Sequence, residues 1–259
     1  MFEINPISVP KAATVLANAL REQILDGRIA EGQTLPNERD LASRAGLSRS
    51  SVREALRMLE TEGLVVTRPG RAGGAEVVRP DISMIQRSME TFIRGKGIRL
   101  ESVLQAREAV EPQAARLAAQ FWTDEDWAAL SESHERLIQE QGDLPRFLKA
   151  NFDWHQAVVK ASQNELLIAF ITSIAQPLYA ATDLRGFNSM EVRHAVCVAH
   201  GKVMDALRAR DADAAWRRMG RHVGAYHESV QQRSRDDEQA EQALLVAGEP
   251  PPESTQSGT

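Results

Sequence analysis

The sequence lacks the features that place a protein in a membrane or outside the cell. It contains a single cysteine, Cys197, so a disulfide within one chain is impossible. Cys197 lies in an apolar helical run, which favours a small buried side chain over a reactive thiol. No stretch approaches the roughly 20 apolar residues of a membrane-spanning helix. The N-terminus has no basic region followed by an apolar core, the pattern of a signal peptide. We therefore expect a cytoplasmic protein with no membrane partner.

An excess of positive charge is absent as well. The 259 residues carry a formal net charge of −5, which is unusual for a protein that only clamps DNA. Residues 1–80 hold 11 Lys and Arg against 10 Asp and Glu, whereas residues 81–259 hold 20 against 26. The length suffices for two domains of ordinary size. Any nucleic-acid contact is therefore expected in the first 80 residues, and the acidic remainder is not expected to bind DNA.

Residues 35–79 carry the strongest local signals. A short helix is predicted over residues 38–45, and Gly46 ends it because glycine tolerates a left-handed backbone. Ser48 then caps a second helix over residues 49–62, whose apolar side chains fall on one face. Two helices joined by a tight glycine turn form a helix-turn-helix. In this motif the second helix enters the major groove with its N-terminal residues nearest the bases.

A hairpin is predicted directly after these helices. Two short β-prone runs, residues 64–67 and 75–78, flank the glycine- and arginine-rich sequence RPGRAGG. Such a hairpin forms a wing with a basic tip that follows phosphates or probes a minor groove. The alternative is a surface-charged helix pair with no role in DNA binding. The joint occurrence of clustered serines and arginines, a glycine turn and a basic hairpin argues against it.

The segments LPNERDLA, GLSRSSVREALRMLETEGLV and RPGR resemble the winged helix of the GntR family of bacterial transcription regulators. The resemblance covers residues from about 12 to 79. The wing departs from the family, because it reads GRAGGAEV where a shorter GxGxxV ending is more common. Together with the basic wing tip, the resemblance implies a set of DNA-contacting residues: Arg39, Ser48, Arg49, Ser50, Arg53, Gly70 and Arg71.

The rest of the chain has helical periodicity and no alternating strand pattern. We predict a mainly α fold, with a winged helix-turn-helix domain over residues 1–80 and an all-α domain over residues 99–234. A helical linker over residues 81–98 joins them, and a polar, disordered tail follows over residues 235–259. The all-α domain is predicted to be a six-helix bundle, with helices near 99–121, 124–141, 143–161, 164–183, 189–209 and 211–233.

All six histidines lie in this second domain. Asn151 and His155 are four residues apart, so they face the same way from one helix. His200 and His222 fall on consecutive antiparallel helices. Three imidazoles and an oxygen donor inside a bundle suit a divalent transition metal. On spacing alone, however, a histidine on an apolar helix face is more often a hydrogen-bonded core residue. The remaining histidines are expected at the surface: His134, His194 and His227.

Three further segments resemble the FCD ligand-binding domain of the FadR-type branch of the GntR family: LESVLQAREAVEPQAARLAA, FLKANFDWHQAVVKASQNELL and AHGKVMDALRARDADAAWRRMGRHV. In that family four positions bind zinc or another divalent ion beside a small carboxylate effector. Here they fall on Asn151, His155, His200 and His222. Asn151 stands where the family has an aspartate, and an amide oxygen brings no charge. The resemblance therefore implies a weaker metal site, or one in which the bound acid supplies the negative ligand.

Arg107 is the candidate for binding the acid. Glu111 follows it by one helical turn, so an ordinary i,i+4 salt bridge explains the pair. Alternatively, the guanidinium points into a cavity and binds a carboxylate through two hydrogen bonds. The family resemblance favours the second interpretation. Further polar contacts to the effector are expected from Ser173, Gln176 and Arg193.

These observations predict a DNA-binding transcriptional regulator controlled by a small organic or sugar acid. Because one reading helix covers only a few base pairs, a homodimer on a palindromic operator is expected. Repression relieved by the effector is the commoner behaviour in the family. Two alternatives remain open. One is a metal-dependent enzyme fused to a DNA-binding head, although no general base or catalytic motif accompanies the histidines. The other is a regulator whose bundle is only a dimerisation scaffold.

Overall fold

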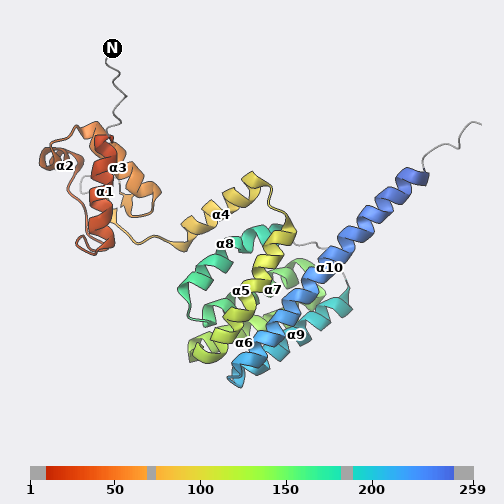
Figure 1. Ribbon diagram of the computed structural model, residues 1–259. Helices are drawn as coiled ribbons and strands as arrows, with labels where there is room; N and C mark the ends of the chain where they lie inside the picture. The colour runs from red at the N-terminus through yellow and green to blue at the C-terminus, as the bar shows by residue number, and fades with distance from the viewer. Residues whose placement is uncertain (1–9, 69–73, 182–188, 248–259) are drawn as a thin grey trace, which may run out of the picture. The chain divides into compact units, whose positions relative to one another are not determined.

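The computed structural model describes residues 10–68, 74–181 and 189–247. The chain divides into two compact units, Met1–Ile85 and Gln86–Thr259. The described part is mainly helical with one small sheet, which confirms the predicted fold class (Figure 1). No helix in these described ranges is long and apolar enough to cross a membrane.

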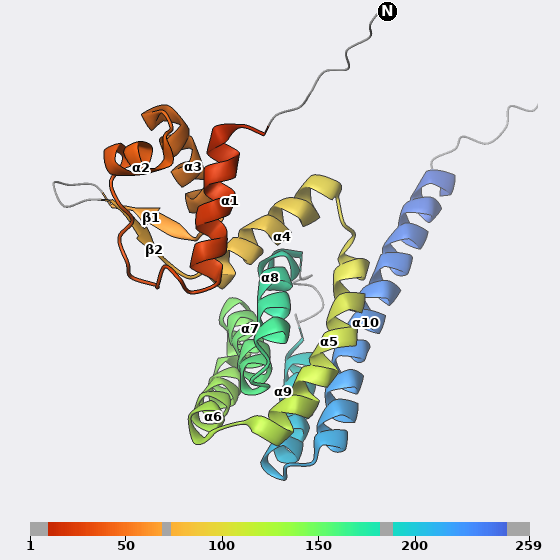
Figure 2. The ribbon, with the colours of Figure 1, turned by 60° about the vertical axis from the view of Figure 1, so that its left-hand side comes forward.

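The first unit is a winged helix-turn-helix (Figure 2). Its elements in chain order are α1 (Ala12–Leu25), α2 (Glu38–Ala45), α3 (Arg49–Thr61), β1 (Val65–Thr67) and β2 (Ala75–Val77). The two strands pair antiparallel, with Val66 opposite Glu76. The predicted hairpin and both predicted helices of the motif are therefore confirmed.

Local capping explains where the two motif helices begin and end. Gly46 adopts φ 65° after α2, a left-handed conformation that glycine adopts without steric cost. The Ser48 hydroxyl accepts a hydrogen bond from the Ser51 amide at 3.1 Å, which satisfies a free donor at the start of α3. These two residues set the angle between α2 and α3.

The core of this unit joins all of its elements. The predicted apolar face of α3 is buried, namely Val52, Ala55, Leu56 and Leu59. It packs against the small buried side chains Ala13 and Ala17 of α1 and against Val65 and Val77 of the strands. The opposite face of α3 therefore remains exposed.

The second unit is the predicted bundle. The bundle helices in the described residues are α5 (Leu100–Phe121), α6 (Asp124–Gln139), α7 (Leu144–Ala161), α8 (Glu165–Ala181), α9 (Met190–Arg208) and α10 (Ala212–Ala247), with a short 3₁₀ turn at Glu140–Gly142. The boundary between the units falls inside α4 (Ile82–Lys96), which is helical as the linker prediction required.

The prediction of a disordered tail from residue 235 is wrong for its first part, because α10 continues to Ala247. Residues 235–247 read RDDEQAEQALLVA and are rich in alanine, glutamate, glutamine and leucine, which favour helix. Residues 248–259 lie outside the described part of the chain.

Helix α5 is the centre of the bundle and lies along α10 in both views (Figures 1 and 2). The buried alanines Ala115, Ala118 and Ala119 allow neighbouring helices to approach closely. A proline, Pro112, lies in the interior of α5. Gly220 of α10 packs against its ring, since a Cβ there would lie 3.7 Å from Pro112 Cγ.

Candidate functional site

Three histidines from three helices meet in the second unit. His155 lies on α7, His200 on α9 and His222 on α10. The Nε2 atoms of His200 and His222 are 2.9 Å apart, and those of His222 and His155 are 3.2 Å apart. The ligand atoms of the three imidazoles all lie within 4.8 Å of one another. The structure thus brings together the histidines that the sequence grouped.

Burial keeps these imidazoles neutral. Desolvation lowers the pKa of His200 and of His222 well below the ordinary histidine value. Desolvation also lowers the pKa of His155, although the neighbouring Glu111 carboxylate works in the opposite direction. Neutral imidazole is the form that offers a lone pair to a metal ion.

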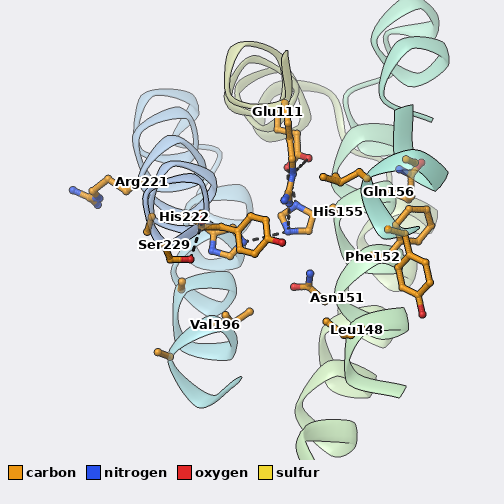
Figure 3. Close-up of a pocket in the computed structure, with 18 of the residues that line it drawn as sticks. Glu111, Leu148, Asn151, Phe152, His155, Gln156, Val196, Arg221, His222 and Ser229 are labelled. Carbon is orange, nitrogen blue, oxygen red and sulfur yellow. Dashed lines mark hydrogen bonds and ion pairs between the residues drawn. The ribbon is translucent and has the colours of Figure 1, made fainter. Parts of the chain in front are cut away.

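The donor set fits a divalent cation. Four ligands held tetrahedrally by zinc at its usual bond lengths are about 3.3 Å apart, close to the measured Nε2 separations. Asn151 Oδ1 is buried and has no hydrogen-bond partner among the described residues. Figure 3 shows Asn151 projecting into the same space as His155 and His222. An unsatisfied buried acceptor beside three imidazoles is what an absent fourth ligand bond leaves behind.

Arg107 and Glu111 lie directly behind this cluster. Arg107 Nη2 is 2.7 Å from His155 Nε2, and Glu111 Oε2 is 2.7 Å from His155 Nδ1. Arg107 Nε also donates to Glu111, and both side chains are buried. Burial alone would raise the pKa of Glu111, but the charge of Arg107 and the contact with His155 lower it overall. Arg107 therefore makes the predicted salt bridge and also lines the cavity.

Sequence reasoning missed Glu111 as a site residue and treated it only as a partner of Arg107. The i,i+4 spacing was the available signal, but its contact with His155 depends on how α5 packs against α7. Glu111 fixes one imidazole and one guanidinium at once.

A cavity of approximately 660 Å³ opens beside these residues. Its wall is largely apolar, with contributions from Leu148, Phe152, Ile171 and Ile174. Glu111 is the single carboxylate among the described lining residues. The basic lining residues are Arg107, Lys202, Arg218 and Arg221, the last of which points away from the histidines in Figure 3. The excess of positive charge on an apolar wall suits an anion whose carbon skeleton is apolar or partly polar.

Two of the other predicted effector contacts do not line this cavity. Ser173 is buried on α8 and donates its hydroxyl hydrogen to the Phe170 carbonyl at 2.7 Å. Arg193 is buried on α9. Neither is among the described residues that line the cavity. The side chain of Gln176 lies outside what the structure describes.

The histidines expected at the surface differ among themselves. His194 is exposed and His134 is half-buried. The expectation is wrong for His227, which is buried on α10 with Nδ1 2.9 Å from Glu108 Oε1 of α5. Cys197 is buried as expected, and desolvation raises the pKa of its thiol to about 11.

The first unit presents an arginine-rich surface around the N-terminus of α3. Arg39, Arg49, Ser50 and Arg53 are exposed there, on the face opposite the buried core. Two further arginines that the sequence analysis did not select, Arg57 and Arg68, border the same surface hollow. Arg57 lies one helical turn after Arg53, a spacing that was visible in the sequence.

Two of these residues already have partners within the unit. Ser48 caps α3, and its hydroxyl lies 2.8 Å from that of Ser50. Arg53 forms two hydrogen bonds with Glu38 of α2, at 2.8 and 2.7 Å. This pair holds the guanidinium beside the exposed start of α3. The predicted wing residues Gly70 and Arg71 lie outside the described residues.

Two family models match the chain, and together they span both units. The model for bacterial regulatory proteins of the gntR family matches residues 12–73. The model for the FCD domain matches residues 102–225, which include Arg107, Glu111 and the three clustered histidines.

Similar proteins match this chain over most of its length. The HTH-type transcriptional repressor NanR of Enterobacter sp. is 27% identical over 228 residues, covering 85% of each chain. NanR of Klebsiella aerogenes is 28% identical over 228 residues, covering 84% of this chain and 85% of its own. The solved structure of Streptococcus agalactiae GntR has the same fold, with a TM-score of 0.66 and 24% identity over 84% of this chain and 99% of its own. This chain is therefore a DNA-binding transcriptional regulator that carries the domain of the gntR family of bacterial regulatory proteins, followed by an FCD domain.

Proposed function

We propose that this regulator is a repressor whose operator affinity is controlled by a small organic or sugar acid, bound beside a divalent metal ion in the FCD domain. One observation carries the proposal. The cavity lining brings together the unsatisfied Asn151 amide oxygen, the Arg107 guanidinium and the neutral imidazoles of His155 and His222. The third imidazole, His200, is buried directly beside His222. The names of the relatives, which are repressors, support the proposed sign of regulation.

His155, His200, His222 and Asn151 are the residues that would hold the metal, and zinc suits a set rich in imidazole. When bound, the ion supplies positive charge that attracts an anionic oxygen of the acid. All four donors are neutral, so they leave that charge uncompensated. A bound carboxylate is therefore the natural source of a negative ligand at this site.

Arg107, whose guanidinium contacts His155 Nε2, would bind the acid beside the cluster. A guanidinium recognises a carboxylate through paired, charge-assisted hydrogen bonds. The apolar wall, including Phe152 and Ile171, accommodates the carbon skeleton. Lys202 and Arg218 on the cavity lining raise the local concentration of anions.

The exposed start of α3 would read the operator, with Arg49 and Arg53 nearest the base edges. Because one such helix covers few base pairs, two copies of the chain on a palindromic site are proposed. Acid binding would favour a form of the dimer with lower operator affinity. A coupling of about 1–3 kcal/mol is typical of such regulation.

Calorimetric titration of zinc-loaded protein against a panel of small carboxylic and sugar acids tests the proposal. We expect one acid to bind and to release the protein from an operator selected out of random DNA. Arg107→Ala should weaken binding of that acid by about tenfold or more, since it removes a charged hydrogen-bond donor. DNA binding without acid should be unchanged.

Arg116→Ala is the matched control. Arg116 lies on the same helix but pairs with Asp213 at the surface, at 3.0 Å. Its removal should leave acid affinity as in wild type. If no acid in the panel changes either the melting temperature or the operator affinity, the bundle is a dimerisation scaffold and the effector proposal is wrong.

A further inference from the structure

Glu111 contacts both functional halves of the site. One carboxylate oxygen accepts from Arg107 Nε, and the other lies 2.7 Å from His155 Nδ1. The residue is only 2% exposed, so water does not compete for these contacts. The acid-binding arginine and a candidate metal ligand therefore share one buried anion.

The contact with Glu111 decides which nitrogen of His155 carries hydrogen. Glu111 Oε2 lies 2.7 Å from Nδ1, where a carboxylate oxygen would repel a nitrogen lone pair, so the hydrogen of the neutral ring sits on Nδ1. Nε2 then has a free lone pair directed toward His222, whose Nε2 is 3.2 Å away. This is the tautomer in which His155 can serve as a ligand through Nε2.

The Arg107 guanidinium also contacts this lone pair of His155. Arg107 Nη2 lies 2.7 Å from His155 Nε2 and donates to it. A hydrogen bond from Arg107 and a bond to a metal ion require the same orbital of His155, so they exclude each other. The guanidinium that covers this lone pair is also the group that an incoming carboxylate would engage.

We infer that Glu111 is a positioning residue that couples acid binding to metal binding, an inference that rests on the proposed function. Without acid, Arg107 lies across the His155 lone pair and shares the Glu111 carboxylate with His155. An acid that binds Arg107 draws the guanidinium away from His155. The Nε2 lone pair is then free, and the Glu111 carboxylate contacts His155 alone. Each ligand then raises the affinity for the other, as linkage requires.

Zinc affinity measured without any acid, by competition with a chromophoric chelator, tests the inference. E111Q should bind zinc about 10–100-fold more weakly, because the partner that orients His155 loses its charge. R107Q should bind zinc about tenfold more tightly, because a charged donor no longer competes for Nε2. Opposite changes from two contacting residues cannot arise from a general loss of folding.

E108Q is the matched control for a carboxylate on α5 that pairs with a histidine. Glu108 Oε1 lies 2.9 Å from His227 Nδ1, outside the donor cluster. The zinc affinity of E108Q should equal that of wild type. The visible absorption bands of bound Co²⁺ should shift in E111Q and remain unchanged in E108Q.

The double variant R107Q/E111Q serves if E111Q alone fails to fold, since it removes both members of the buried ion pair. It should bind zinc about 10–100-fold more weakly than R107Q. Wild-type zinc affinity in E111Q, or weakened affinity in R107Q, overturns the inference and leaves the proposed function standing. If wild-type protein binds no zinc, the metal part of the proposed function falls together with the inference.

Discussion

Trp154 stacks on His200, with ring centroids 3.7 Å apart and 14° between the ring planes. Both side chains are fully buried, and the indole edge also meets His155 at a centroid distance of 4.9 Å. His200 Nδ1 has no hydrogen-bond partner among the described residues. Stacking on Trp154 therefore sets the orientation of the His200 ring. A histidine that binds a metal is usually oriented instead by a hydrogen bond from its other ring nitrogen.

Replacing this tryptophan should weaken metal binding without removing a ligand. We expect Trp154→Leu to lower zinc affinity about 3–10-fold, the size of a typical aromatic pair interaction. Trp154→Phe keeps an aromatic face against His200 and should retain most of the affinity. Competition titration measures both, and Trp122→Leu is the control for losing a tryptophan elsewhere in the bundle. Equal losses in the leucine and phenylalanine variants would count against the stacking role.

Arginines at the start of α3 should dominate sequence-specific DNA binding. Arg49→Ala and Arg53→Ala should each cost about 1–3 kcal/mol of operator binding, the value of a good bidentate base contact. The Arg53–Glu38 pair is exposed, so its loss should change the melting temperature little. Mobility-shift titration measures the affinity. Arg28→Ala, which removes an arginine paired with Asp26 away from α3, is the control. Unchanged affinity and specificity in both α3 variants would refute the assignment of this surface.

Asn151→Asp should tighten metal binding, because it adds a negative charge to a neutral donor set. We expect a gain of about tenfold or more, as attraction between close charges near a protein surface implies. Metal analysis after dialysis against a mild chelator measures it. Asp153→Asn is the control, since Asp153 pairs with Lys149 and Arg136 instead.

The same experiment decides the role of the cluster. If Asn151→Asp retains no more metal than wild type under any condition, the site is a metal-free polar pocket. The histidines would then donate hydrogen bonds to the acid.

Buried neutral histidines should make the metal-free protein sensitive to acid pH. The folded-state pKa values of His155, His200 and His222 are lowered by burial, whereas the unfolded chain titrates near 6.5. Below about pH 6.5 the unfolded state binds more protons than the folded state, so the free energy of unfolding decreases as the pH is lowered. Above that value this contribution is fully present.

Melting temperatures in the presence of chelator, between pH 7.5 and 5.5, measure this loss. His200→Asn should show a shallower decline than wild type, because one fewer buried imidazole resists protonation. His194→Asn replaces an exposed histidine and should follow the wild-type curve. A His200→Asn curve parallel to wild type would contradict the argument.

Short-range patterns predicted the first unit well because its signals are local. Gly46 and Ser48 act within a few residues of their own positions, and the β-prone runs flank their own turn. The helix bounds in the bundle followed from apolar periodicity in the same way. The grouping of Asn151 with the three histidines followed from the family resemblance, since spacing alone left their role open.

Long-range packing accounts for what the sequence did not reveal. Glu111 meets His155 only because α5 lies beside α7, and no spacing within α5 encodes that contact. His227 became buried for the same reason, through Glu108 on a helix more than a hundred residues earlier. The length of α10 was underestimated because a polar composition was taken for disorder, although its residues favour helix.

Pro112 gives helix α5 a point of reduced stiffness. Proline has no amide hydrogen, so the carbonyl of Glu108 receives no bond from it and one rung of the helix is missing. Arg107 immediately precedes the turn that lacks this rung, and Glu111 lies within it. Bending α5 at this turn costs less than bending an unbroken helix, so a small displacement of the guanidinium relative to the carboxylate meets little elastic resistance.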